Sequence, residues 1–418
     1  SIDSNVLIFE RIREELARGT GIRLAVTQGY NAAYSAIIDS NVTSLLTGII
    51  LYVFGSGPIQ GFATTLIIGI FCSLFASIFI TRLIFEGRLA AKRAITVATG
   101  ISKGAFSKVN YDFVGKRKMA YIFSGLVILA GIGSMATRGF NYGVDFLGGR
   151  SYMVEFQEAV NTGDVSTALE GAFGGTAPTV KTFGADNRVK VITAYRIDDN
   201  SETADDEVQA ALIEGLSGVA GNTAEVLSSQ KVGPTIADDI KRSAVLSIFF
   251  SLIVIFLYIL IRFKKWQYSL GAVIALFHDV LFVLSLFSLF YGFAPFSMEI
   301  DQAFIAAILT VVGYSINDTV VVFDRIREYQ NEHQARKHAF AQIANGALNS
   351  ALSRTVITSL TTFIVLLVLF LAGGETIKGF SFALLAGIVV GTYSSAFIAT
   401  PVMLEFTKDE PAKEKKNK

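Results

Sequence analysis

The 418-residue chain is poor in charge and rich in apolar residues. Asp, Glu, Lys and Arg make up 17% of it, and the mean hydropathy is +0.51, whereas an average globular protein is about 25% charged. The 36 basic and 35 acidic residues nearly cancel, so net charge indicates no partner. This composition argues against a soluble enzyme or a nucleic-acid-binding protein. Cys72 is the only cysteine, which excludes a disulfide framework and a thiolate metal site.

Uncharged apolar runs predict helices that cross a membrane. Runs of about 18 or more such residues are typical of bilayer-spanning helices. A helix that ends near Phe9 comes first, and two polar stretches, 10–31 and 324–350, are expected to be surface helices or solvated connectors. The predicted spans are 37–54, 61–84, 119–137, 243–261, 267–291, 302–323, 351–372 and 379–406. The sequence therefore predicts a polytopic α-helical membrane protein.

Charge and hydropathy divide the chain into segments. We expect a transmembrane part at 1–84, a linker at 85–118, one span at 119–138, a polar domain at 139–242, five further spans at 243–406 and a charged tail at 407–418. Lys and Arg concentrate in 82–118, in 262–265 and in the tail, which the positive-inside rule assigns to the cytoplasm. The polar domain is then outside. The apolar start at Ser1 predicts that the chain begins within a longer protein.

The polar domain has the pattern of a small α/β fold. Alternating or β-rich runs surround two helical stretches, 165–173 and 204–216, in the order βαββαβ. That order predicts a ferredoxin-like split βαβ sandwich. The β-rich runs are 151–156, 179–183, 188–195 and 224–232.

Two regions of the chain repeat each other. Residues 3–15 (DSNVLIFERIREE) align with 317–329 (NDTVVVFDRIREY), and 35–62 aligns with 353–380. Transporters are often built from such duplicated membrane bundles. The repeat predicts the end of one bundle half followed by a complete second half.

Ionisable residues inside predicted spans are candidate functional residues, because burying a charge in hydrocarbon costs a few kcal/mol or more. Asp318 lies deep in its span, Asp3 lies near it in the repeat, and Arg354 opens the next span. We interpret these three residues as an ion or proton relay, in which a change of charge shifts the balance between two bundle arrangements.

The alternatives for these residues are structural. Asp3 and Asp318 are the kind of residue that also makes static hydrogen bonds, and Arg354 is near enough to an interface to snorkel into water. Asp39 is open to a structural interpretation, and His278 to that of a satisfied core histidine. The second group of candidate relay residues is Asn5, Asp39, His278, Asp279, Asn317, Thr319 and Thr358.

Long motifs resemble the SecF family of protein-export membrane proteins. They are GVDFLGGR (143–150), SSQKVGPTIADDI (228–240), ALFHDV (275–280), GYSINDTVVVFDRIRE (313–328) and SRTVITSLTT (353–362). Residues 2–16 and 39–70 resemble the end of SecD. The chain thus resembles a fused SecDF that lacks most of its SecD half, and the resemblance implies an RND-superfamily membrane fold with the single span at 119–138 as the first SecF-like helix.

The resemblance also implies a function. It indicates an accessory motor of the Sec translocon in the bacterial cytoplasmic membrane, driven by a proton or sodium gradient, with no cofactor and no covalent chemistry. The implied partners are the SecYEG channel, the SecA ATPase, YajC, YidC, unfolded preprotein and membrane lipid, with no nucleic acid. Asp3, Asp318 and Arg354 match the ion-path residues of the family. Because the large first external domain of SecD is missing, we expect the chain alone to be inactive.

Two other functions are compatible with a duplicated bundle. An RND-type exporter of small molecules or lipids would need a substrate-sized apolar cleft in its external domain. A passive scaffold for the translocon would need no relay. The sequence has no GxxxxGK[ST] motif, so nothing in it indicates a nucleotide-driven pump.

Overall fold

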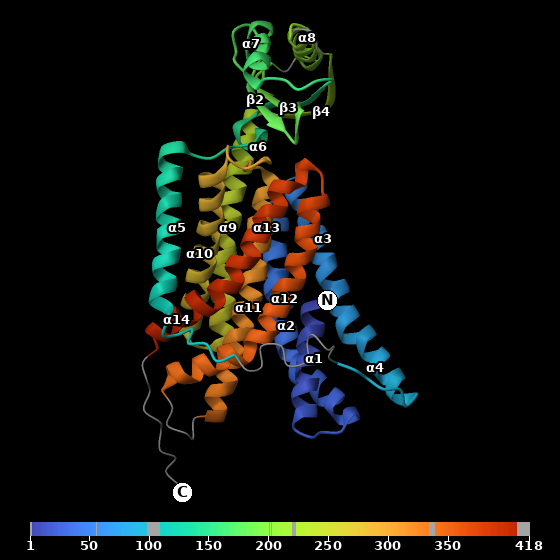
Figure 1. The fold of residues 1–418 in the computed structure, drawn as a ribbon, viewed down its shortest axis with the longest axis vertical. Helices are drawn as coiled ribbons and strands as arrows, with labels where there is room; N and C mark the ends of the chain where they lie inside the picture. Colours follow the sequence, from blue (N-terminus) through green and yellow to red (C-terminus); the bar gives the residue numbers. More distant parts are fainter. Residues whose placement is uncertain are drawn as a thin grey trace.

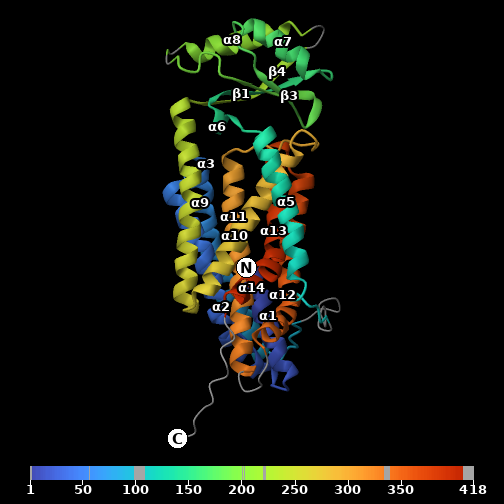
Figure 2. The ribbon, with the colours of Figure 1, turned by 90° about the vertical axis from the view of Figure 1, so that its left-hand side faces the viewer.

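The protein is a bundle of long helices that carries a small α/β domain at one end (Figures 1 and 2). The computed structural model describes residues 2–55, 57–97, 109–199, 201, 203–219, 223–333 and 339–407. Part of the predicted linker, 98–108, and the predicted tail beyond Thr407 lie outside the described residues. We call the end of the bundle that carries the α/β domain the domain end, and the other the opposite end.

Helices form almost all of the bundle. Within the described residues, eight continuous helical segments are long and apolar enough to cross a membrane; one of them joins α3 to α4 and another joins α13 to α14. This confirms the predicted polytopic α-helical fold. The helices of the bundle are α1 (Ile2–Ala17), α2 (Ile22–Phe54), α3 (Pro58–Leu74), α4 (Thr81–Ala90), α5 (Arg117–Arg138), α9 (Pro234–Phe263), α10 (Trp266–Phe290), α11 (Gln302–His333), α12 (Phe340–Ala372), α13 (Glu375–Ser394) and α14 (Thr400–Glu405).

Several helices extend beyond the predicted spans. The polar stretch 10–31 does not form a helix of its own. Helix α1 continues into it and ends at Ala17, and helix α2 begins within it at Ile22. The stretch 324–350 likewise contains the end of α11 and the beginning of α12. Hydropathy marks where apolar side chains stop, but the backbone hydrogen bonds of a helix continue through polar residues whose side chains find partners.

Three predicted segment boundaries fall inside helices for the same reason. The boundary after residue 84 lies within α4, which ends at Ala90, and the boundary after residue 118 lies within α5, which begins at Arg117. The predicted end of the polar domain at Arg242 lies within α9, which begins at Pro234. Charged residues at the ends of a span therefore belong to the same helix as the span.

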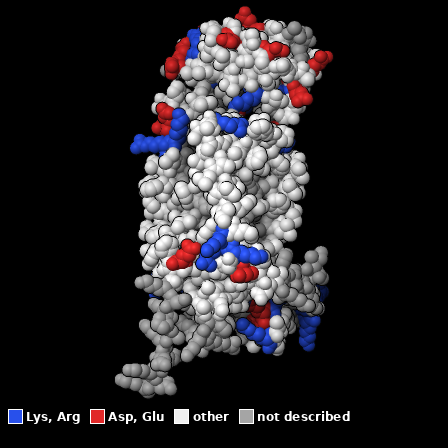
Figure 3. Space-filling model, turned by 60° about the vertical axis from the view of Figure 1, so that its left-hand side comes forward, with Lys and Arg blue, Asp and Glu red and all other residues white. Residues whose placement is uncertain are grey.

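Charged side chains gather towards the two ends of the molecule, and the surface between them is almost free of charge in the view of Figure 3. Large apolar side chains are exposed on the bundle, among them Leu83, Leu126, Leu129, Val245 and Leu371. A surface of this kind faces lipid hydrocarbon, not water.

The domain has the predicted ferredoxin-like fold. Its elements follow the order β1 (Gly149–Phe156), α7 (Thr162–Ala172), β2 (Thr179–Phe183), β3 (Ala185–Thr193), α8 (Ala204–Ser217) and β4 (Ala224–Val232). The sheet order is β2-β3-β1-β4, with every pair antiparallel. Alternate residues of β1 and β3, such as Val154 and Val189, are buried against α7 and α8, as the period of two in a strand requires.

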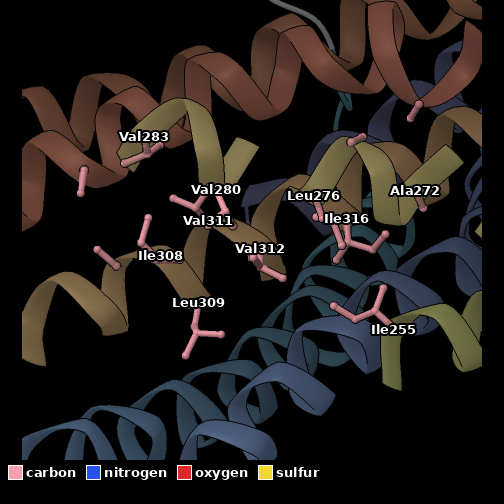
Figure 4. Close-up of a cluster of buried hydrophobic side chains, with 14 of the residues drawn as sticks. Ile255, Ala272, Leu276, Val280, Val283, Ile308, Leu309, Val311, Val312 and Ile316 are labelled. Atoms are coloured by element: carbon pink, nitrogen blue, oxygen red, sulfur yellow. The ribbon is translucent and has the colours of Figure 1, made fainter. Parts of the chain in front are cut away.

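Helix α11 is the centre of the membrane bundle. It packs against α2, α10, α12 and α13, and Figure 4 shows its Ile308, Val311 and Ile316 among the side chains of the core. Gly387 of α13 faces Val311 and Gly391 faces Ser315, so closely that a Cβ at Gly387 would lie 2.0 Å from Val311. Small residues four apart let membrane helices approach in this way.

Within the described residues, each half of the bundle contains one π-helical turn. One comprises Phe75–Ile80, between α3 and α4, and the other Ser395–Ala399, between α13 and α14. In the repeat alignment, 77–80 coincides with 395–398. A threonine follows each turn, Thr81 or Thr400, and donates its hydroxyl to the carbonyl five residues earlier at 3.0 Å.

A joint of loops and polar contacts connects the domain to the bundle. The segment before α11 pairs with the segment after α5 through Tyr142 and Ile300, and Lys190 of β3 pairs with Glu299. The short helix α6 (Val144–Leu147) carries Asp145. Its carboxylate accepts hydrogen bonds from the Gln230 side chain at 2.9 Å and the Gln302 backbone at 3.1 Å.

Candidate functional site

Asp3 and Asn317 meet where the two halves of the bundle touch. They are equivalent positions in the repeat, on α1 and α11, and the Asn317 Nδ2 donates to Asp3 Oδ2 at 2.8 Å. The Oδ1 atom of Asp3 and the Oδ1 atom of Asn317 are buried and have no hydrogen-bond partner among the described residues. The repeat thus brings a carboxylate and an amide together across the interface between the halves.

Asp318, the next residue, is 2% exposed. It lies sixteen residues after the start of α11, which is about 24 Å along the helix. Within the described part of the chain, its carboxylate accepts one long hydrogen bond of 3.4 Å from Ser359 of α12, and Thr392 of α13 donates to that serine at 2.6 Å. A carboxyl group so deeply buried is bonded less well than a static structural role would require.

Arg354 of α12 is 4% exposed, so it does not snorkel to the surface. Its Nε and Nη1 atoms have no hydrogen-bond partner among the described residues. Its charge acts on both Asp3 and Asp318, and these two carboxyl groups also interact with each other. The three predicted ion-path residues therefore form one electrostatic group without a direct ion pair among the described atoms.

Unpartnered polar atoms concentrate in this group. Thirteen buried side-chain atoms in the described part of the chain have no hydrogen-bond partner, and six of them belong to predicted site residues. Since nearly all buried polar groups in proteins are bonded, such a concentration is unusual for a static core. The residues concerned are Asp3, Asn5, Asn317, Thr319 and Arg354; Thr358, by contrast, donates to the Arg354 carbonyl at 2.9 Å.

A cavity of about 440 Å³, lined by both polar and apolar side chains, reaches Asp3 and Asn317. Helices α2, α3 and α11 line it, largely with hydroxyl-bearing and small residues such as Ser40, Ser44 and Thr47. Thr47 lies seven residues from the domain end of α2, or about 10 Å. The cavity therefore extends from Asp3 towards the domain end.

Four charged residues join α1 to α11 on the side of Asp3 and Asp318 that faces the opposite end of the bundle. Arg11 of α1 pairs with Glu328 of α11 at 2.9 Å, and Arg325 of α11 pairs with Glu14 of α1 at 2.8 Å. Each arginine also pairs with the glutamate three residues further along its own helix. Arg11 and Arg325 are repeat equivalents, as are Glu14 and Glu328. We call these residues the four-charge cluster; the RIRE motif present in both halves was the signal that could have predicted it.

Asp39 lies outside the group. It accepts from the Nε of Arg262 at 2.6 Å and from the Tyr258 hydroxyl at 3.1 Å, both on α9. Arg262 also pairs with Asp324 of α11 at 3.5 Å. Asp39 thus joins α2 to α9 through a well-bonded ion pair.

His278 and Asp279 form a second buried network, which contacts α11 at Ser315, one helical turn before Asp318. Asp279 is fully buried and accepts from the hydroxyls of Ser315 at 2.5 Å and Ser394 at 2.8 Å, as well as contacting His278 Nδ1 at 2.9 Å. The Nε2 of His278 lies 2.8 Å from the Ser124 hydroxyl. This network, which we call the His278–Asp279 network, links α5, α10, α11 and α13, and both ring nitrogens have partners, as in a satisfied core histidine.

Comparison with known proteins identifies the family. A family model described as "Protein export membrane protein SecD/SecF, C-terminal" matches residues 1–87 and 213–409, and a "SecD/SecF GG Motif" model matches 133–160. The chain belongs to the SecD/SecF family of protein-export membrane proteins. The protein translocase subunit SecF of Rhodothermus marinus is 50% identical over 72% of this chain and 94% of its own length.

The fused SecDF proteins extend beyond this chain. The protein translocase subunit SecDF of Thermus thermophilus is 33% identical over 99% of the chain, which spans 54% of that relative. The crystal structure of SecDF from that organism superposes with a TM-score of 0.84 over 97% of this chain and 53% of its own. A second SecDF structure, in a "Super-membrane-facing form", gives 0.72. The chain therefore spans about half the length of its SecDF relatives.

The membrane fold is shared more widely. The hedgehog release protein Disp of the water bear Hypsibius dujardini superposes with a TM-score of 0.60 at 11% identity, which shows a common fold alone. Among the described residues, no group of three or more His, Cys, Asp or Glu side chains is arranged to hold a metal ion.

Proposed function

We propose that this chain is the ion-driven part of an accessory motor of the Sec translocon. It uses a proton or sodium gradient to move the α/β domain while preproteins complete their passage across the bacterial cytoplasmic membrane. The family membership and the names of the relatives, protein translocase subunits, support the pathway. The observation that carries the mechanism is the incompletely bonded group of Asp3, Asp318 and Arg354 between the two halves.

The distribution of basic residues orients the proposed motor. Among the described residues, Lys and Arg gather in 82–97, 116–118 and 262–265, at the opposite end of the bundle, and this end is assigned to the cytoplasm. The domain end then faces outside, where preprotein emerges. In this orientation the cavity lined by Ser40, Ser44 and Thr47 leads from the outer half of the membrane to Asp3, and the four-charge cluster closes the cytoplasmic side.

The proposed coupling rests on the charge balance around Arg354. When Asp3 or Asp318 takes up a proton or exchanges an ion, one of the negative charges that attract Arg354, which also include Glu10, is removed. The arginine then favours contacts with the remaining carboxylates, and α12 shifts against α1 and α11. A ligand moves such an equilibrium only by binding one arrangement more tightly, and the unpartnered atoms supply that difference in binding.

Two solved structures of SecDF relatives differ in their likeness to this chain. They superpose on it with TM-scores of 0.84 and 0.72, and the second is described as a "Super-membrane-facing form", which supports a second arrangement of the fold. Opening of the four-charge cluster in the second arrangement would release the ion to the cytoplasm. The driving force is the gradient, and the chain itself catalyses no covalent step and needs no cofactor.

The partners follow from the pathway. One SecDF structure is described as that of a translocon-associated membrane protein. We therefore propose that the SecYEG channel, with SecA on its cytoplasmic side, is the assembly beside which this chain works, and that unfolded preprotein is the substrate of the domain. YajC and YidC stay candidate partners.

Substitution of Asp318 by Asn tests the proposal. The complete product of the gene is placed in inverted membrane vesicles, and the completion of export of a preprotein is measured after ATP is removed, with and without an ion gradient. We expect Asp318→Asn to lose the gradient-dependent part of export, because an amide takes up no proton at neutral pH. Glu86→Gln, which changes an exposed carboxylate paired with Arg82 on α4, is the control.

Two outcomes would contradict the relay. One is an unchanged dependence on the gradient in Asp318→Asn, and the other is an equal loss in Glu86→Gln. Replacing Na⁺ by choline in the same assay identifies the ion: a sodium-driven motor stops, whereas a proton-driven motor continues until an uncoupler is added.

A further inference from the structure

An apolar groove lies in the membrane bundle directly beneath the joint. Its volume is about 480 Å³. Helices α9, α10 and α11 form its walls with Ile248, Leu284 and Ile305, and the segment that enters the domain covers it with Phe140 and Phe146. The groove is therefore part of the membrane bundle and not of the α/β domain.

The groove lies at the depth of one leaflet of the bilayer. Its deepest residue on α10, Val280, is ten residues from the end of that helix at Phe290, which is about 15 Å, or half of a hydrocarbon core about 30 Å thick. Val280 and Ile308, which both line the groove, lie among the core side chains in Figure 4. Val245, another lining residue, is 68% exposed on the surface of the bundle. The medium that meets this groove is therefore lipid.

One charged residue lines the groove, and it lies at the mouth. Lys241 is eight residues into α9, one position before Arg242, after which the charge-free run of that helix begins. It thus lies at the level at which the helix leaves the hydrocarbon. Lys241 pairs with Asp238 in an exposed ion pair at 2.9 Å, which contributes little stability. A lysine so placed can pair with a phosphate at the membrane surface.

The groove has room for a lipid tail. An acyl chain is a single file of methylene groups and needs far less width than a helix about 10 Å across. A groove of about 480 Å³ that opens to lipid therefore accommodates one acyl chain.

We propose that the groove between α9, α10 and α11 binds one membrane phospholipid, with an acyl chain against Ile248 and Leu284 and its phosphate at Lys241. The bound lipid contacts the bundle and the segment at 140–147 at once. It therefore stabilises the joint on which the domain moves. The lipid is a resident component and is not transported.

Native mass spectrometry tests the proposal. The chain is placed in nanodiscs of phosphatidylglycerol and phosphatidylethanolamine, released into mild detergent, and the fraction that retains one phospholipid is measured. We expect wild type to retain one phospholipid and Ile248→Trp, which fills the groove, to lose it. Ile253→Trp is the matched control, because Ile253 lies on the same helix, is 38% exposed and does not line the groove.

The phosphate contact has its own pair of variants. Lys241→Gln should weaken retention about fivefold, the factor expected from one lysine near the headgroups, whereas Arg242→Gln should not change it. Lys241 is exposed, so this substitution keeps the test valid if Ile248→Trp fails to fold. Equal retention in Ile248→Trp and Ile253→Trp, or equal retention of diacylglycerol and phosphatidylglycerol, would overturn the proposal.

Photo-crosslinking separates a lipid from a protein occupant. A benzoylphenylalanine at Leu284, inside the groove, is activated in native membranes. We expect an adduct of phospholipid mass. An adduct with another polypeptide would show that a protein segment occupies the groove, and the lipid proposal would then be wrong.

Discussion

Helix α11 carries two buried polar regions that differ in how completely they are bonded. Ser315 belongs to the His278–Asp279 network, in which the fully buried carboxylate has three partners between 2.5 and 2.9 Å. Asp318, one helical turn further on, has one partner at 3.4 Å among the described residues and an arginine nearby with two unpartnered nitrogens. Asp279 and Asp318 are both almost fully buried, so burial alone does not distinguish a mobile site from a static one. The number and the length of the hydrogen bonds distinguish them.

This difference suggests a division of labour. The His278–Asp279 network holds α5, α10, α11 and α13 together, and a fully satisfied buried network is rigid. The group around Asp3, Asp318 and Arg354 lies where α1, α11 and α12 meet and has contacts left to make. We expect the first region to act as a fixed frame against which the second region rearranges.

The largest expected effect comes from removing the carboxylate of the frame. Asp279→Asn leaves donors of two serines and a histidine without a charged acceptor, and we expect it to lower the free energy of unfolding by about 3 kcal/mol. Asp318→Asn should change that free energy by less than about 1 kcal/mol, because it removes one long hydrogen bond. Unfolding in mixed detergent measures both. A loss of similar size in the two variants would remove the distinction between the regions.

A substitution in the close packing of α13 against α11 should lower the free energy of unfolding by nearly as much. Gly387→Ala places a Cβ 2.0 Å from Val311, and overpacking of this kind costs about 1–3 kcal/mol. Gly69 is the equivalent glycine in the repeat, and a Cβ added there would have no described atom within 4 Å. Gly69→Ala should therefore be neutral in the same unfolding assay. If Gly387→Ala leaves the free energy of unfolding as unchanged as Gly69→Ala does, then α13 can shift relative to α11, and the two helices do not form a fixed frame.

Serine substitutions compare the hydrogen bonds of the two regions. Ser315→Ala removes a short bond to the Asp279 carboxylate and should cost about 1.5 kcal/mol or more. Ser359→Ala removes the 3.4 Å contact with Asp318 and the 2.6 Å bond from Thr392, whose hydroxyl keeps the Ile388 carbonyl as a partner, and it should lower the free energy of unfolding by less than Ser315→Ala, about 0.5–1 kcal/mol. The reverse order of the two values would mean that Asp318, not Asp279, is held in place by its bonds.

The smallest effect is expected at the four-charge cluster. A double-mutant cycle of Arg11→Gln and Glu328→Gln should give a coupling energy of about 0.5–1 kcal/mol, because the pair is partly exposed. The repeat-equivalent cycle of Arg325→Gln and Glu14→Gln should give a similar value. A coupling energy near zero in both would show that the cluster does not hold α1 against α11.

Much of this architecture could be predicted from the sequence. Charge-free runs identify the spans, and alternation in strands identifies the βαββαβ domain, because both patterns follow from which face of an element is buried. Asp3, Asp318 and Arg354 stand out because charge is costly in a membrane. The contact between Asp3 and Asn317 follows from the repeat, since equivalent residues of paired halves meet at their common interface.

Other features leave no comparable pattern. Ser124, Ser315 and Ser394 come from three helices, and their spacing in the sequence does not indicate that they converge on His278 and Asp279. The extension of α1 and α11 through charged residues depends on the pairing of Arg11 with Glu328 across the halves, a tertiary contact. Whether Asp39 joins the ion-path group or pairs with Arg262 is likewise decided by the packing of α2 on α9, which hydropathy does not determine.

The two π-helical turns have a consequence for the ancestry of the molecule. A π turn accommodates one residue more than an α turn, and here the extra residue occurs at matching places, 77–80 and 395–398, in both halves. Two independent insertions at the same place are less economical than one. The insertion therefore predates the duplication, and the single-bundle ancestor already contained this irregular helix. Thr81 aligns with Ala399, so the similar hydrogen bonds of Thr81 and Thr400 are made at positions offset by one residue.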